Sequence, residues 1–200
     1  MGRAAPAHPV LVETTARMDL VEITPQSHAV ILSLAYATPQ NITGKPIYRQ
    51  AKCYLHKDAE PKLVRAIEVA KGIDLTLKIF DAFRPNEAQW MLWNHAPNPE
   101  FFADPRKGSP HSRGVAVDLT LVDSAGAELE MGTPFDDMTP NAHHGALTVS
   151  PAAQRNRAIL LGVMTAAGWD FYKNEWWHYQ LFNSRSFPLF AEADLKLGLM

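Results

Sequence analysis

Short hydrophobic segments, two of which alternate with polar positions, predict four β-strands in this chain. Residues 75–80 alternate with a period of two, and so do residues 115–122, where Val117 and Leu119 share one face and Asp118 lies on the other. Residues 29–36 form an apolar run whose length suits a strand, and residues 177–182 are expected to form the last one.

Three longer segments carry the signals of helices. Residues 61–71 follow Asp58, place apolar side chains on one face and stop at Gly72. Arg84-Pro85 predicts a helix that opens there and runs to about residue 94, because proline is tolerated in a first turn. Ser150-Pro151 starts the clearest helix, which Gly168 ends. Its expected buried stripe is Ile159, Leu160, Val163, Met164 and Ala167.

These few, irregularly linked strands favour an α+β fold, with a central antiparallel sheet flanked by helices, over a Rossmann or barrel pattern. We expect one catalytic domain over residues 1–200, in which residues 1–18 form a loosely ordered lead-in containing two prolines. Residues 131–150 are rich in Asn, Pro and His and predict a long loop. Loops of this length are often functional.

Composition narrows the classes of function. The 200 residues are 46% hydrophobic with a net charge of −2, so nothing indicates a nucleic-acid partner, and no apolar run approaches a membrane span. The first residues lack the apolar core of a signal peptide, which makes the cytoplasm the default expectation. A periplasmic protein that has lost its signal peptide is the alternative. The single cysteine, Cys53, is interpreted as a small hydrophobic residue.

Four side chains predict metal chemistry. His111 and Asp118 are seven residues apart, and Gly114 allows a sharp bend between them, so both can reach one metal ion. His178 would be the third ligand, which leaves a fourth position on a catalytic zinc for water or substrate. Glu175 precedes His178 by three residues, so we expect the last strand to start after Glu175 and the carboxylate to lie near the metal without binding it.

The other histidines are interpreted as surface or hydrogen-bonded residues. Adjacent histidines in a loop rarely aim at one point, so the pair at 143 and 144 is at most a weak metal site. This group comprises His8, His28, His56, His95, His143 and His144.

The pattern Ser109-x-His111-x-x-Gly114-x-Ala116-x-Asp118, together with Glu175-x-Trp-His, resembles the zinc D-alanyl-D-alanine dipeptidases of the VanX type. These belong to the peptidoglycan D,D-peptidase fold group, which Hedgehog signalling domains share. Further likeness is found in residues 36–44, in the arginine motif of residues 81–85 and in the pocket loop of residues 131–136. The resemblance therefore covers roughly residues 18–185.

The resemblance implies a role for each matching residue. His111, Asp118 and His178 would bind one zinc ion, and Glu175 would act as general base and then as general acid. Arg84 would stabilise the oxyanion of the tetrahedral intermediate with its fixed, permanently charged fork of donors. The substrate pocket would be lined by Ser109, Tyr36 and Asp136, the last as partner of the substrate ammonium, with Asp137 as the neighbouring alternative.

The expected function is therefore zinc-dependent hydrolysis of the small dipeptide D-Ala-D-Ala to free D-alanine. One alternative is a D,D-carboxypeptidase or endopeptidase that acts on peptidoglycan peptides. A dipeptidase must close its pocket to longer chains and bind a free ammonium, and this property separates the two. A non-catalytic zinc-binding module is the other alternative, but a structural zinc requires neither Glu175 nor Arg84. The sequence leaves the oligomeric state and the physiological role open.

Overall fold

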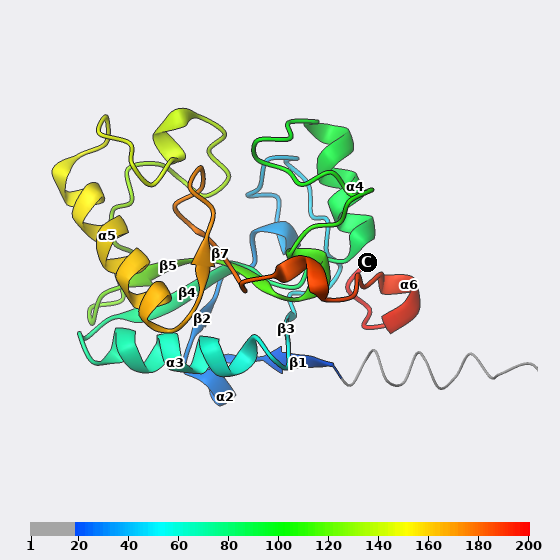
Figure 1. Cartoon of the computed structure of the whole chain (residues 1–200), viewed down its shortest axis with the longest axis horizontal. Helices are drawn as coiled ribbons and strands as arrows, with labels where there is room; N and C mark the ends of the chain where they lie inside the picture. The colour runs from blue at the N-terminus through cyan, green and yellow to red at the C-terminus, as the bar shows by residue number, and fades with distance from the viewer. Residues whose placement is uncertain (1–18) are drawn as a thin grey trace, which may run out of the picture.

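The computed structural model describes residues 19–200, and a five-stranded sheet at its centre positions the candidate site (Figure 1). The strand order is β2-β4-β5-β7-β6. Their bounds are β2 Ile31–Leu32, β4 Thr76–Asp81, β5 Ala116–Val122, β6 Asp170–Phe171 and β7 His178–Gln180. All neighbours pair antiparallel except β2 and β4, which are parallel. The expected α+β class is confirmed, with one parallel pair at the sheet edge.

A separate antiparallel pair, β1 (Leu20–Ile23) and β3 (Cys53–His56), lies below the main sheet in Figure 1. The short α2 (Pro25–His28) follows β1. Cys53 is a buried free cysteine, as its interpretation as a small hydrophobic residue requires.

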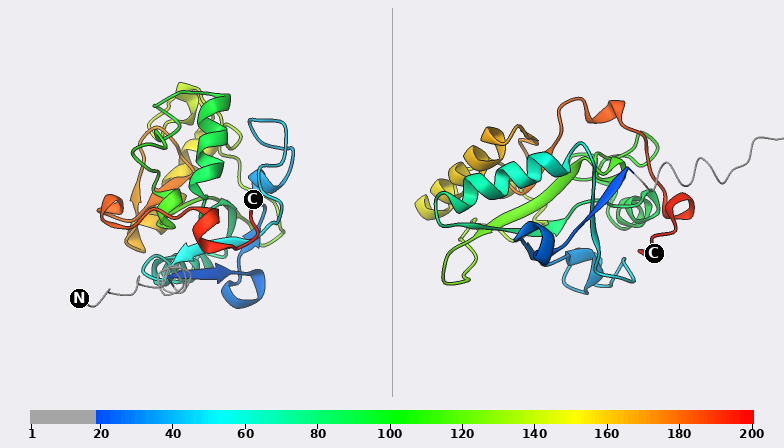
Figure 2. Two further views of the ribbon diagram at one scale, coloured as in Figure 1. Left: turned by 90° about the vertical axis from the view of Figure 1, so that its right-hand side faces the viewer. Right: turned by 90° about the horizontal axis from the view of Figure 1, so that it is seen from below.

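Helices α3 (Glu60–Lys71) and α5 (Pro151–Ala166) lie side by side on one face of the sheet (Figure 2, right). The Ser150 hydroxyl accepts the N–H of Ala153, so α5 begins as the sequence predicted. One detail of its predicted stripe is wrong, because Ile159 is 39% exposed. Arg157 is buried instead, since its guanidinium binds backbone carbonyls of the loop before the helix.

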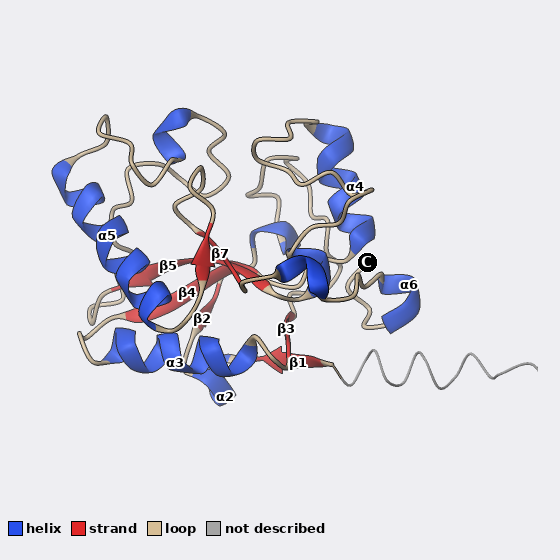
Figure 3. Ribbon diagram, viewed as in Figure 1, coloured by secondary structure: helices blue, strands red, loops and turns tan. Residues whose placement is uncertain are grey.

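Helix α4 (Asn86–His95) stands at the other end of the molecule, near the short α6 (Glu192–Leu195) (Figure 3). It starts one residue after Pro85 rather than at Arg84, because Pro85 is still extended at ψ 148°. Arg84 therefore lies in the turn between β4 and α4, where its side chain points into the protein interior.

The strand predicted over residues 29–36 is mostly wrong. Only Ile31–Leu32 pair in the sheet, and Ala35–Ala37 form a 3-10 turn that buries Tyr36. The remaining 3-10 turns are His111–Arg113, Pro140–Ala142 and Ser184–Ser186. Residues 131–150 form the expected long loop around the second of these turns.

Within residues 19–200, none of the helices has the length and hydropathy that a membrane span requires. The lead-in predicted over residues 1–18, with His8, lies outside the described residues.

Candidate metal centre and active site

The three predicted metal ligands meet at the middle of the sheet. Asp118 lies on β5 directly opposite His178 on β7, so the register of two neighbouring strands places both side chains together. His111 comes from the 3-10 turn just before β5. The chain returns through Gly114, whose φ of +68° favours glycine and where a Cβ would come within 2.8 Å of a Leu20 methyl group.

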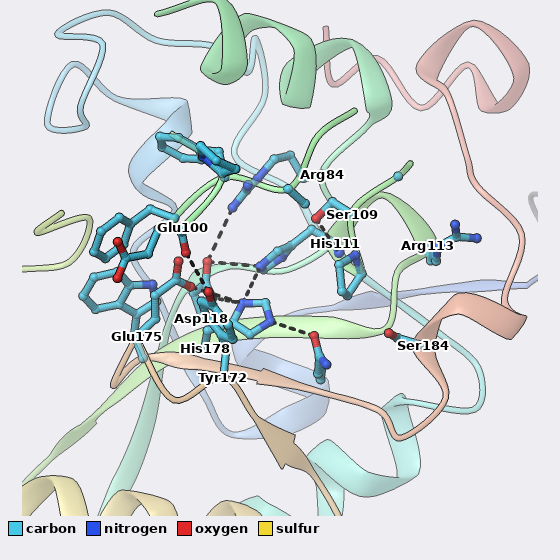
Figure 4. A pocket seen from close by; sticks show the side chains of 18 of the residues that line it. Arg84, Glu100, Ser109, His111, Arg113, Asp118, Tyr172, Glu175, His178 and Ser184 are labelled. Carbon is cyan, nitrogen blue, oxygen red and sulfur yellow. Dashed lines mark hydrogen bonds and ion pairs between the residues drawn. The ribbon is translucent and has the colours of Figure 1, made fainter. Parts of the chain in front are cut away.

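Each candidate ligand is buried, and one possible ligand atom from each of the three lies within 4.8 Å of those of the other two. His111 Nε2 is 3.1 Å from His178 Nδ1 and 3.3 Å from Asp118 Oδ2, and His178 Nδ1 is 3.0 Å from Asp118 Oδ1. Tetrahedral ligands at 2.0–2.2 Å from zinc lie roughly 3.3–3.6 Å apart. Figure 4 shows the three side chains pointing toward one another.

The outer hydrogen bonds of the two histidines identify which nitrogens are free for a metal. His111 Nδ1 lies 2.7 Å from the Ala82 carbonyl, which can only accept, so Nδ1 carries the proton and Nε2 keeps a lone pair. His178 Nε2 lies 3.2 Å from Gln180 Oε1, which leaves Nδ1 facing the group. Two lone pairs and a carboxylate thus converge on one point, an arrangement that a cation stabilises.

Electrostatics keeps Asp118 ionised. Burial alone would raise its pKa, but the adjacent imidazoles of His111 and His178, when they are protonated, hold the pKa of this carboxyl well below its usual range. The donor set of two imidazoles and one carboxylate is that of a catalytic zinc site, and the residues present fit such an ion.

Glu175 lies next to this group without joining it. The strand β7 starts at His178, so Glu175 stands on the preceding turn, with Oε2 3.8 Å from His178 Nδ1. Burial raises the pKa of Glu175 to about 8. The position is the one expected from the sequence: close to the metal ligands, and outside the group of three.

Arg84 is buried and held by three neighbours. Its Nε and Nη2 each lie 2.8 Å from Asp81 Oδ2, Nη1 donates to Gln89 Oε1 at 2.9 Å, and the guanidinium carbon is 4.8 Å from the Tyr36 ring centroid. The other N–H group of Nη2 points toward Asp118 Oδ2, 3.5 Å away. The guanidinium therefore faces the place where the three metal ligands converge.

Asp81, Tyr48 and Gln89 support this arginine and were missed by the sequence reasoning. Tyr48 donates to Asp81 Oδ1 at 2.8 Å, and Gln89 Nε2 donates to the Ala103 carbonyl at 2.8 Å. Asp81 had a signal, since it lies three residues before Arg84 within the quoted motif. Gln89 had none, because its partner comes from a distant loop.

Tyr36 and Asp136 meet at one side of the cavity. The Tyr36 hydroxyl donates to Asp136 Oδ1 at 3.0 Å, while Oδ2 is enclosed without a hydrogen-bond partner. Burial raises the pKa of Asp136 to about 7. The neighbouring Asp137 instead accepts the N–H of Thr139 in a local turn, so Asp136 is the carboxylate that lines the cavity.

Ser109 also lines the cavity, and its hydroxyl accepts the N–H of His111 at 3.2 Å. The exposed Glu100 lines the rim of the cavity, where its carbonyl accepts from Tyr172 at 2.8 Å and its carboxylate accepts from Asn174 at 3.0 Å. The cavity measures about 330 Å³. All eight predicted site residues lie around it: Tyr36, Arg84, Ser109, His111, Asp118, Asp136, Glu175 and His178.

The remaining histidines of the described chain lie apart from this group. His143 Nε2 lies 3.2 Å from Glu100 Oε1, and the ring of His144 packs on Phe171 and Tyr179. Among residues 19–200, neither belongs to a group of three metal-ligating side chains.

Comparison with known proteins gives one consistent result. The family described as D-ala-D-ala dipeptidase matches residues 14–191. A D-alanyl-D-alanine dipeptidase of Escherichia coli is 46% identical over 90% of this chain and 92% of its own length. A relative with the same name in Enterococcus faecium is 34% identical over 77% of this chain and 87% of its own length. Another in Streptomyces coelicolor is 37% identical over 73% of this chain and 83% of its own length. The chain belongs to the D-alanyl-D-alanine dipeptidase family of metallopeptidases.

Proposed function

We propose that this protein is a zinc-dependent dipeptidase that hydrolyses D-Ala-D-Ala to two molecules of D-alanine. The observation that carries the proposal is the convergence of two imidazole lone pairs and the Asp118 carboxylate beside Glu175 and Arg84 in one cavity. The names of the relatives support the substrate. The small volume of the cavity agrees with a substrate of dipeptide size.

His111 Nε2, His178 Nδ1 and an oxygen of Asp118 would hold the zinc ion. When bound, zinc supplies a Lewis acid beside the scissile carbonyl and lowers the pKa of water from about 15.7 to about 7. Ala82 and Gln180 keep the two imidazoles oriented for this task through their outer nitrogens.

Glu175 moves the protons of the reaction. Its carboxylate takes one proton from the attacking water, whose oxygen forms a bond to the carbonyl carbon of the first residue. It then delivers that proton to the amide nitrogen as the C–N bond breaks, so the second D-alanine leaves as an amine. The raised pKa of the buried Glu175 suits a group that must both accept and release a proton near neutral pH.

Arg84 stabilises the negative charge that develops on the carbonyl oxygen. Because Asp81, Gln89 and Tyr36 already fix its guanidinium, no reorganisation is needed when the oxyanion forms. Asp136 and Tyr36 bind the substrate ammonium, and Asp136 Oδ2 is the acceptor left free for it. Ser109, which lines the same cavity, is a further contact for the substrate.

A substrate panel tests the proposal on zinc-loaded protein, with free D-alanine as the readout. We expect cleavage of D-Ala-D-Ala, much slower cleavage of L-Ala-L-Ala, and little or none of N-acetyl-D-Ala-D-Ala or longer peptides, since these leave the buried Asp136 unpaired. Efficient cleavage of the acylated or longer peptides by the unaltered protein would identify a carboxypeptidase or endopeptidase instead.

A further inference from the structure

A second cavity of about 650 Å³ adjoins the catalytic one, and Asp136 lines both. Tyr36 lines the catalytic cavity. Ala35, which precedes Tyr36, and Phe135, which precedes Asp136, line the second cavity. Its lining mixes apolar side chains with neutral polar ones: Leu32, Ser33, Leu34, Ala35, Thr38, Gln40, Asn41, Ile42, Ala51, Phe80, Pro134, Phe135 and Asp136. Asp136 is the one charged residue among these.

The partition between the two cavities is built from Tyr36, Phe135 and Asp136. Phe135 stacks on Phe80 with ring centroids 5.0 Å apart and meets the Tyr36 ring edge-on at 6.0 Å, so the core of the protein holds the two aromatic rings in place. Asp136 completes the partition through its 3.0 Å hydrogen bond from the Tyr36 hydroxyl.

Asp136 is also the member of this partition whose side chain is easiest to replace. Its backbone has a φ of +62°, in the left-handed region that glycine adopts without strain and that asparagine tolerates better than most residues. The side chain can therefore be shortened or neutralised without disturbing the backbone, which is not true of the two packed aromatic rings.

We propose that the Asp136 side chain is a steric wall as well as the ammonium partner, and that removing it joins the two cavities into one channel for a peptide extended at its N-terminus. This inference rests on the proposed function, which places the substrate ammonium at Asp136. In an extended peptide an amide replaces the ammonium at that point, and the preceding residue must continue beyond Asp136. The second cavity lies there, and its uncharged lining suits a neutral peptide segment.

Two substitutions at this position separate charge from bulk. Asp136→Asn removes the charge but keeps the size and the contact with Tyr36, whereas Asp136→Gly removes both and fits the positive φ. Cleavage of D-Ala-D-Ala, N-acetyl-D-Ala-D-Ala and Gly-D-Ala-D-Ala is measured for both zinc-loaded variants and for the unaltered protein. Bound zinc per chain and the thermal unfolding midpoint establish that each variant is folded.

We expect both variants to lose kcat/KM on the free dipeptide. Only Asp136→Gly should gain on the two extended substrates, by about tenfold or more relative to Asp136→Asn, as is typical when a pocket gains the room for a missing group. An equal gain in both variants would mean that charge alone excludes extended peptides, and no gain in a folded, zinc-loaded Asp136→Gly protein would mean that the cavities stay separate. Either result would reject the proposal that the Asp136 side chain blocks extended peptides sterically.

The proposed function fails separately, on the unaltered protein. If that protein does not cleave D-Ala-D-Ala, the assignment of the substrate is wrong and the inference falls with it. If it cleaves the dipeptide but the glycine variant gains nothing, the function stands and the wall alone is rejected.

Discussion

Glu175 stands beside three convergent candidate metal ligands, 3.8 Å from one of them, and its own side chain is buried. The substitution Glu175→Gln keeps the size of the side chain and removes its ability to take a proton. We expect this variant to retain one zinc ion and the fold, and to lose about 10²–10⁴-fold in kcat. Metal analysis of the purified variant is the control, since loss of zinc would show that Glu175 is a ligand instead.

Arg84 is expected to act mainly on the transition state. Arg84→Lys preserves a positive charge beside Asp81 but cannot direct a second fixed donor toward Asp118, because an ammonium lacks the planar fork. Its kcat should fall more than its KM rises, with a cost of about 3–4 kcal/mol for one lost oxyanion donor. A change in KM alone would mean that Arg84 binds the substrate carboxylate in the ground state.

Asp136 should make substrate binding depend on pH. Burial raises its pKa to about 7; Arg84 and the Tyr36 hydroxyl oppose this shift, and the charges of Asp118 and Asp81 add to it. Below that pH the carboxyl takes up a proton and loses the charge that attracts the substrate ammonium. KM for D-Ala-D-Ala should therefore rise as the pH falls, by about tenfold one pH unit below the pKa.

Asp136→Asn is the matched control for this pH dependence, because its amide does not titrate in this range. Its KM should be higher than that of the unaltered protein and independent of pH between about 6 and 7, where the dipeptide amine is still largely protonated. A KM that rises equally in both proteins at low pH would assign the titration to another group.

At the scale of elements, α4 connects Arg84 to the rim of the cavity. Gln89 accepts from Arg84 through its oxygen and donates to Ala103 through its nitrogen, so one buried side chain joins the arginine to the segment that carries Glu100. Gln89→Glu keeps the acceptor for Arg84 and removes the donor for Ala103. Gln89→Leu removes both.

The two Gln89 variants should therefore differ in kinetics. Gln89→Glu loses the hydrogen bond to the Ala103 carbonyl but still holds Arg84. It should therefore raise KM and leave kcat within a few-fold of that of the unaltered protein. Gln89→Leu should lower kcat as well, because Arg84 Nη1 is left buried without a partner, at a cost of about 1–3 kcal/mol. A purely structural role would lower the unfolding midpoint of both variants and leave the ratio of their kcat values near one.

Elements could be predicted from sequence where local signals and packing agree. The alternation of β5 and the Ser150 cap of α5 are such cases. The start of β7 after Glu175 is another, because Glu175 and His178 would face opposite sides in a regular strand. The run 29–36 was misjudged because apolar composition does not distinguish a strand from a buried turn. Tyr36 is buried by packing on Tyr48 and Phe135, which are distant in the sequence.

For the whole molecule, the sequence indicated which side chains line the candidate site better than it indicated which residues support them. The eight predicted residues surround one cavity because their motifs lie at fixed positions on neighbouring strands and turns. The contacts of Asp81 with Tyr48 and of Gln89 with Ala103 depend on distant groups that the fold brings close. The contact of Gln180 with His178 follows instead from strand alternation, since the two residues share a face of β7.

The charge balance of the assembled site predicts that the metal also stabilises the fold. Asp81 and Asp118 are both buried beside Arg84, so these two carboxylates outnumber the one permanent positive charge and a divalent cation offsets the excess. Zinc at one hundred times its Kd should raise the free energy of unfolding by about 2.7 kcal/mol. At roughly 2–4 °C per kcal/mol for a chain of this size, the unfolding midpoint should rise by about 5–10 °C. Calorimetry with zinc and with a chelator measures this difference, and His111→Ala should abolish it. Equal midpoints in the unaltered protein would contradict the metal site.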